Sequence, residues 1–184
     1  MKTITNIIAA AIIACTASLA AAQGVTVADD VVDAGALSMS LNGSFTMAAD
    51  VTLHGEGLVI GNPGRATLAI EGGKVVFTIG GEVFDGIERD TYSTMVRVPE
   101  GAVSVRIEAS YDGENMVLRV TDRAITRAQR TNAPEAGMML EQLSMMEEIM
   151  GGGECSHTLV FGNPEACGST APAYTGTISG VVVQ

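Results

Sequence analysis

Apolar and polar residues alternate through most of residues 36–122, and this period of two predicts β-strands rather than helices. The clearest case is the segment 66-ATLAIEGGKVVFTI-79. A two-residue turn at Gly72-Gly73 would place the apolar residues of both arms on one face, in the pairs Ala66–Ile79, Leu68–Phe77 and Ile70–Val75. The opposite face would pair Glu71 with Lys74, two opposite charges. The pattern therefore predicts a β-hairpin over 66–79.

A second hairpin is predicted by the same alternation in residues 92–107. A turn at Glu100-Gly101 would align Val96 with Val105 and keep the apolar residues of both arms on one face. We therefore expect these two arms to be neighbours in one sheet.

A third hairpin is expected around Asp112-Gly113, but its register stays open. The shortest loop sets Arg106 opposite Arg119, two like charges, which is unfavourable in a cross-strand pair. A loop two residues longer sets Glu108 opposite Arg119 instead. Both registers bury the same face of the hairpin.

The segment 37-LSMSLNGSFTM-47 is predicted to be one long strand with a bend or bulge at Gly43. Running straight, it places its large apolar residues on one face: Leu37, Met39, Leu41, Phe45 and Met47. Further strands are expected near residues 51–60 and 173–183. The predicted fold class is mainly β, an antiparallel meander forming a barrel or a sandwich. Aromatic residues make up only 4% of the chain and Trp is absent, so the aromatic girdles of a membrane barrel are missing.

One amphipathic helix, over about residues 133–150, is predicted to pack on the β layer. Asn132 can cap it, Glu135 lies three residues further on, and Gly151 follows its end. At about 100° per residue its apolar residues fall on one broad face: Met138, Met139, Leu143, Met145, Met146, Ile149 and Met150. Leu140 falls on the polar side of this projection.

The methionines of this helix allow three interpretations. Methionine fills irregular gaps, so the face can pack on the sheet as ordinary core. The face can also cover a small apolar ligand or a protein partner, with these predicted contact residues: Met139, Leu143, Met146 and Met150. The third interpretation is a Cu(I) site, because thioethers favour that ion and His157 lies near Cys155.

The first 22 residues have the pattern of a secretory signal peptide, with Lys2, an apolar run and a small-residue cleavage site after Ala22. The prediction is an exported protein, periplasmic or extracellular, with residues 23–184 forming a single domain. A rival cleavage would leave Cys15 as a lipoprotein anchor. Export favours a structural disulfide between the other two cysteines, Cys155 and Cys167.

The chain carries 21 acidic and 10 basic residues, a net charge of −11 that disfavours binding to nucleic acid or anionic lipid. Arg123, Arg127 and Arg130 would share a face if Asp122 capped a short helix, which would make an anion site. Solvated arginines paired with the acidic surface are the simpler interpretation.

We find no catalytic, cofactor or metal-binding motif in the sequence, and no apolar segment after the signal long enough to span a membrane. The predicted function is an exported, non-catalytic β domain that binds a small apolar ligand or a protein partner beneath the Met-rich helix. The alternatives are a structural or assembly subunit of a bacterial cell envelope and a Cu(I)-binding periplasmic protein. The sequence does not predict the oligomeric state.

Overall fold

A computed structural model of the 184-residue chain describes residues 43–80, 90–150, 159–162, 165 and 172–183. The predicted signal peptide, Cys15, Leu37, Met39 and Leu41 lie outside the described residues, as do Cys155, His157 and Cys167. The predictions made for these residues therefore stay predictions.

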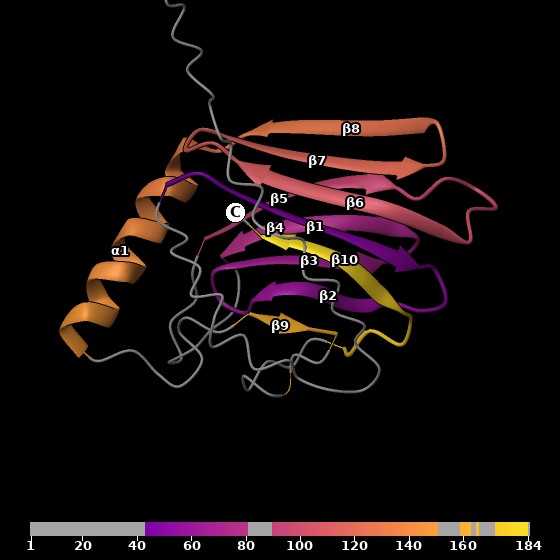
Figure 1. Ribbon diagram of the computed structural model, residues 1–184. Coiled ribbons are helices and arrows are strands. Elements are labelled where there is room, and N and C mark those ends of the chain that lie inside the picture. The colour runs from indigo at the N-terminus through magenta and orange to yellow at the C-terminus, as the bar shows by residue number, and fades with distance from the viewer. Residues whose placement is uncertain (1–42, 81–89, 151–158, 163–164, 166–171, 184) are drawn as a thin grey trace, which may run out of the picture.

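In the described residues the architecture is a sandwich of two five-stranded antiparallel sheets with one helix (Figure 1). Sheet A has the strand order β10-β1-β6-β7-β8, and sheet B has the order β5-β4-β3-β2-β9. The strands are β1 (Phe45–Thr52), β2 (Gly57–Asn62), β3 (Ala66–Glu71), β4 (Lys74–Gly80), β5 (Thr91–Arg97), β6 (Ser104–Tyr111), β7 (Asn115–Asp122), β8 (Ile125–Asn132), β9 (Val160–Phe161) and β10 (Ile178–Val183). Helix α1 (Pro134–Met150) stands at one end of the strands. Of the two architectures predicted, the structure adopts the sandwich.

An apolar core fills the space between the two sheets, because alternate residues of β1, β4, β6 and β7 point inward. Phe45 of β1 and Phe77 of β4 meet edge to face across it, with ring centroids 6.0 Å apart. Such pairs of aromatic rings add to the free energy gained from burial alone. Most buried apolar residues of the two sheets and of α1 belong to one large cluster, so the helix packs on the same core; Leu58 and Val160 form a small second cluster.

The hairpin predicted over 66–79 is confirmed in its register. Strands β3 and β4 pair in the expected combinations: Ala66–Ile79, Leu68–Phe77, Ile70–Val75 and Glu71–Lys74. Both central turn residues, Gly72 and Gly73, have positive φ, which suits glycine in a two-residue hairpin.

The hairpin expected over 92–107 is wrong. Strand β5 pairs with β4 in sheet B, whereas β6 pairs with β1 and β7 in sheet A. Val96 and Val105 are both buried, but they belong to opposite layers of the sandwich. The turn at Glu100-Gly101 thus connects the two sheets. A connection of this kind buries the same alternate residues as a hairpin would, so the alternating pattern does not distinguish the two.

The open register around Asp112-Gly113 resolves in favour of the longer loop. Glu108 lies opposite Arg119, and Arg119 Nη1 is 2.6 Å from Glu108 Oε1. The Asp112 side chain accepts hydrogen bonds from the backbone N–H groups of Glu114 and Asn115, which holds its pKa below the ordinary value.

The long strand expected over 37–47 is described only from Gly43 onward. Strand β1 begins at Phe45, and Phe45 and Met47 are buried on the predicted face. The strand predicted near 51–60 is in fact the end of β1 and most of β2. The strand predicted near 173–183 is confirmed in part as β10, Ile178–Val183.

The short helix considered for Arg123, Arg127 and Arg130 is also wrong, because residues 125–132 form strand β8. Arg127 and Arg130 lie three positions apart on this exposed edge strand. Because side chains alternate between the two faces of a strand, the two arginines point to opposite faces. The segment pairs along its whole length with β7, and tertiary pairing thereby overrides a weak local helix signal.

Tyr111, buried at the end of β6, links the sheet to the start of α1. Its hydroxyl lies 2.8 Å from the carbonyl oxygen of Gly113 and 3.0 Å from that of Ala133, and it can donate to either. Burial is the main cause that raises the pKa of Tyr111 above its ordinary value.

Replacing Tyr111 with Phe is expected to lower the free energy of unfolding by about 1 kcal/mol, because this hydrogen bond is lost. The raised pKa adds a pH dependence. Above pH ~10 the unfolded phenol ionises while the folded one keeps its proton, so stability falls as pH rises through the folded pKa. Urea denaturation at pH 7 and across pH 9–11 should show a shallower alkaline fall for Tyr111→Phe. An identical fall would contradict this account.

Candidate functional site: the outer surface of helix α1

The inward face of α1 packs on the end of the sandwich through small and branched residues. Ala136 and Leu140 have no exposed surface, and Leu143 is buried beside them. Met139 is partly buried against the core and lies over Gly80, where an added Cβ would come within 3.0 Å of the Met139 sulfur. A stripe at positions 136, 140 and 143 is one face of a helix.

An ion pair fixes the second half of α1 to sheet B. Arg65, in the turn between β2 and β3, is buried with a relative exposure of 4%. Its guanidinium binds both carboxylate oxygens of Glu147, and Nε lies 3.3 Å from Glu147 Oε1. Nη1 also donates to the Ser144 hydroxyl at 3.3 Å. A bidentate pair of this kind fixes orientation as well as distance.

The prediction that the methionine face of α1 packs on the sheet is wrong for most of its members. Met138, Met145, Met146 and Ile149 are exposed, whereas Leu140, assigned to the polar side, is fully buried. Leu143 was placed correctly. The helix has apolar residues on two opposite faces, and a projection of the sequence does not tell which of them the sheet covers.

The exposed residues form one line, which we call the outward stripe: Met138, Met145 and Ile149, with exposed fractions of 58%, 61% and 80%. Met146 lies beside it and is 37% exposed. Positions 138, 145 and 149 repeat every seven and four residues, so their side chains share one face. At 1.5 Å per residue the stripe is about 16 Å long. Apolar side chains gathered on one exposed face make this surface a candidate interaction site.

The surface around the outward stripe is acidic. Glu141 and Glu148 flank it on one side, and both are exposed. Glu135 lies in the first turn of α1, and the helix contains no basic residue. A basic group would therefore be attracted to the rim of this surface, and an acidic group repelled.

The four predicted contact residues fall on different sides of the helix. Leu143 and Met139 face the core, and Met146 is exposed beside the outward stripe. Met150 is the last residue of α1, and its side chain lies outside the described part of the structure. The set does not form one surface.

Arg65 is a residue that sequence reasoning missed. It follows Asn62-Pro63-Gly64, a turn, and directly precedes the apolar strand β3. The sequence did contain one indication of its role: Arg65 is a cation at the start of a buried strand, and a buried cation needs an acidic partner from elsewhere in the chain. The sequence contained no indication of which of its 21 acidic residues supplies it.

Among the described residues, no three His, Cys, Asp or Glu side chains are grouped closely enough to hold a metal ion. The Cu(I) hypothesis depends partly on Cys155 and His157 and stays a prediction. Within the same described part of the chain, no helix is long and apolar enough to cross a membrane.

No protein-family model matches the chain, and no curated protein sequence matches it. Among solved structures, domains LG4-5 of the mouse laminin α1 chain are similar with a TM-score of 0.50 at 12% identity, over 88% of this chain and 38% of that one. The binding domain of botulinum neurotoxin DC in complex with rat synaptotagmin II gives 0.51 at 10% identity, over 87% and 38%. The chain thus spans less than two fifths of either structure. The likeness shows a laminin-G-like β-sandwich fold.

Removing the partner of a buried charge should be costly, so Glu147→Ala is expected to lower the free energy of unfolding by roughly 2–4 kcal/mol. Glu148→Ala is the matched control, because Glu148 is the next residue on the same helix and is exposed. Its effect should stay within about 0.5 kcal/mol. Urea denaturation measures both. Equal effects would mean that Arg65 does not orient the helix.

Proposed function

We propose that this chain is an exported, non-catalytic binding domain and that a protein partner docks on the outward stripe of α1. The observation that carries the proposal is the exposure of Met138, Met145 and Ile149 on a helix whose other side is fixed by Leu140 and the Arg65–Glu147 pair. A surface fixed before binding loses little conformational freedom when the complex forms. Flexible methionine side chains can also adapt to the shape of a partner.

The partner's chemistry follows from the stripe and its rim. We expect an apolar ridge or groove about 16 Å long, bordered by Lys or Arg that face Glu141 and Glu148. An amphipathic helix with a basic border has this form, with its anchors spaced one or two turns apart. The neurotoxin domain with the same fold is itself described in complex with a protein, rat synaptotagmin II.

A second copy of this chain fits the surface poorly. Two α1 helices face to face would bring their glutamates together, and like charges across an interface are unfavourable. Elsewhere in the described residues, the large exposed apolar side chains are single ones on separate segments: Met95, Val103 and Ile125. None of them forms a line that matches the stripe.

The assembly-subunit alternative relies on exposed sheet edges. Strand β8 is such an edge, but it carries Arg127 and Arg130. Charged residues on an edge strand oppose pairing with another chain. These charges therefore argue against assembly of this protein through strand β8.

The small apolar ligand first expected beneath the helix has little room. Ala136, Leu140 and Leu143 pack into the same cluster as the inner residues of both sheets. The protein's own side chains occupy this contact. The proposed binding surface is therefore the outer side of the helix rather than the space under it.

A photocrosslinking amino acid at position 145, in cells that make the protein, tests the proposal. We expect one discrete adduct with a different protein, and mass spectrometry should place the crosslink in an apolar segment flanked by Lys or Arg. The same amino acid at Met95, which is also exposed but lies on β5, should give no such adduct. A crosslinked homodimer would indicate a second copy, and the absence of any adduct would contradict the proposal.

The purified partner then allows an affinity measurement. Met145→Glu places a charge in the centre of the stripe and should weaken binding by at least tenfold, as expected for a buried interface residue worth ~2 kcal/mol. Met95→Glu should leave the dissociation constant unchanged. Similar dissociation constants for the two variants would exclude α1 as the docking surface.

A further inference from the structure

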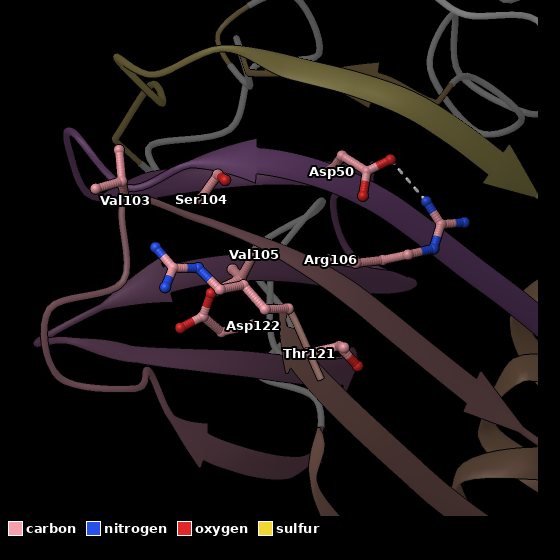
Figure 2. A pocket seen from close by; sticks show the side chains of 8 residues that line it. Asp50, Val103, Ser104, Val105, Arg106, Thr121 and Asp122 are labelled. Atoms are coloured by element: carbon pink, nitrogen blue, oxygen red, sulfur yellow. Dashed lines mark hydrogen bonds and ion pairs between the residues drawn. The ribbon is translucent and has the colours of Figure 1, made fainter. Parts of the chain in front are cut away.

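A hollow of about 290 Å³ opens on sheet A, and it shares no residue with α1 (Figure 2). We call it the Arg106 hollow, and its lining includes Asp50, Val103, Arg106, Thr121, Asp122 and Arg123. These residues come from β1, β6 and β7 and from the turns next to β6 and β7. Three strands of one sheet therefore form its floor, which gives it a fixed shape.

The lining combines two basic and two acidic side chains. Arg106 Nη1 lies 2.8 Å from Asp50 Oδ2 and 3.4 Å from the carbonyl oxygen of Gly180. Figure 2 shows this pair on one side of the hollow and Asp122 on the other. Arg123 is exposed, and it adds the second guanidinium. The formal charges of the four groups cancel, so the hollow is neutral within an acidic protein.

Arg123 has an unusual backbone conformation. Its φ of 54° makes it the one non-glycine residue with positive φ among the described residues. It is the first of the two central residues of the β7–β8 hairpin, a position at which glycine or asparagine is normally found. An arginine here is unfavourable for folding. Strained residues of this kind gather at binding sites, where the side chain is needed more than the relaxed backbone.

The chemistry of the lining favours an uncharged, polyhydroxylated ligand. A guanidinium offers donors only and a carboxylate acceptors only, and here the two types lie side by side. A pair of neighbouring hydroxyl groups can donate to the carboxylate and accept from the guanidinium at the same time. Among the described residues, Arg106 Nε and Nη2 donate to no protein acceptor, so both groups are available as donors to a ligand.

The size of the hollow limits the ligand to a small one. Ligand pockets measure about 300–1,000 Å³, and the Arg106 hollow lies just below this range. Val103, which is exposed at its border, offers an apolar contact for the C–H groups of a ring. We propose that the Arg106 hollow binds one neutral sugar ring, as a free monosaccharide or as one residue of a glycan.

Saturation-transfer NMR on the whole protein tests this, with glucose, galactose, mannose and N-acetylglucosamine as probes, and with glucuronic acid and glucosamine as charged counterparts. We expect at least one neutral sugar to bind and both charged analogues to bind more weakly. Preference for a charged analogue, or no binding of any neutral sugar, would overturn the proposal. A glycan array then separates a free sugar from a residue within a glycan.

The variant Arg123→Gly separates loss of the site from loss of the fold. Glycine accepts φ of 54° without strain, so the melting temperature should rise by a few degrees while sugar binding is lost. Arg130→Ala removes the same charge from the same hairpin but lies outside the hollow, and it should leave binding unchanged. Asp122→Asn should weaken binding about tenfold, because a carboxylate accepts stronger hydrogen bonds than an amide. Unchanged sugar binding by Arg123→Gly would overturn the assignment.

Discussion

The ion pair between Arg65 and Glu147 decides which side of α1 faces the solvent. The helix has an Ala–Leu stripe and a Met–Ile stripe on opposite sides, and hydrophobic burial alone would favour covering either of them. Turning the Met–Ile stripe inward would carry Glu147 into solvent and leave the buried Arg65 guanidinium without its carboxylate. An unpaired buried charge costs several kcal/mol, which is enough to select one rotation. The proposed docking surface exists because of this choice.

The sequence predicted local β structure well because the evidence for it is local. The hairpin 66–79 depends on two glycines and one alternating pattern, and both lie within fourteen residues. The connection from β5 to β6 has the same parity as a hairpin, yet β5 pairs with β4. Partner choice depends on residues far away in the chain, and a single alternating run does not contain that information. The same limit explains why β8 was considered as a helix.

The two candidate surfaces differ in how far the sequence could indicate them. The methionines of α1 were visible as a cluster, but their direction depends on Arg65, some eighty residues earlier. The Arg106 hollow combines Asp50 of β1 with residues of β6 and β7 that follow it by more than fifty positions, and no motif links Asp50 to Arg106. Arg123 stands out only by its positive φ, and this backbone angle cannot be read from the sequence. Sites built by strand pairing across a sheet are assembled in space rather than along the chain.

Methionine oxidation measures the rotation of α1 directly, because hydrogen peroxide converts accessible thioethers to sulfoxides faster than buried ones. Mass spectrometry of briefly oxidised, folded protein gives the rate for each methionine. The account predicts rapid oxidation of Met138 and Met145 and slow oxidation of Met47 and Met116, which lie in the core. Protection of Met145 to the same degree as Met47 would show that α1 turns its methionines inward, and would contradict the account.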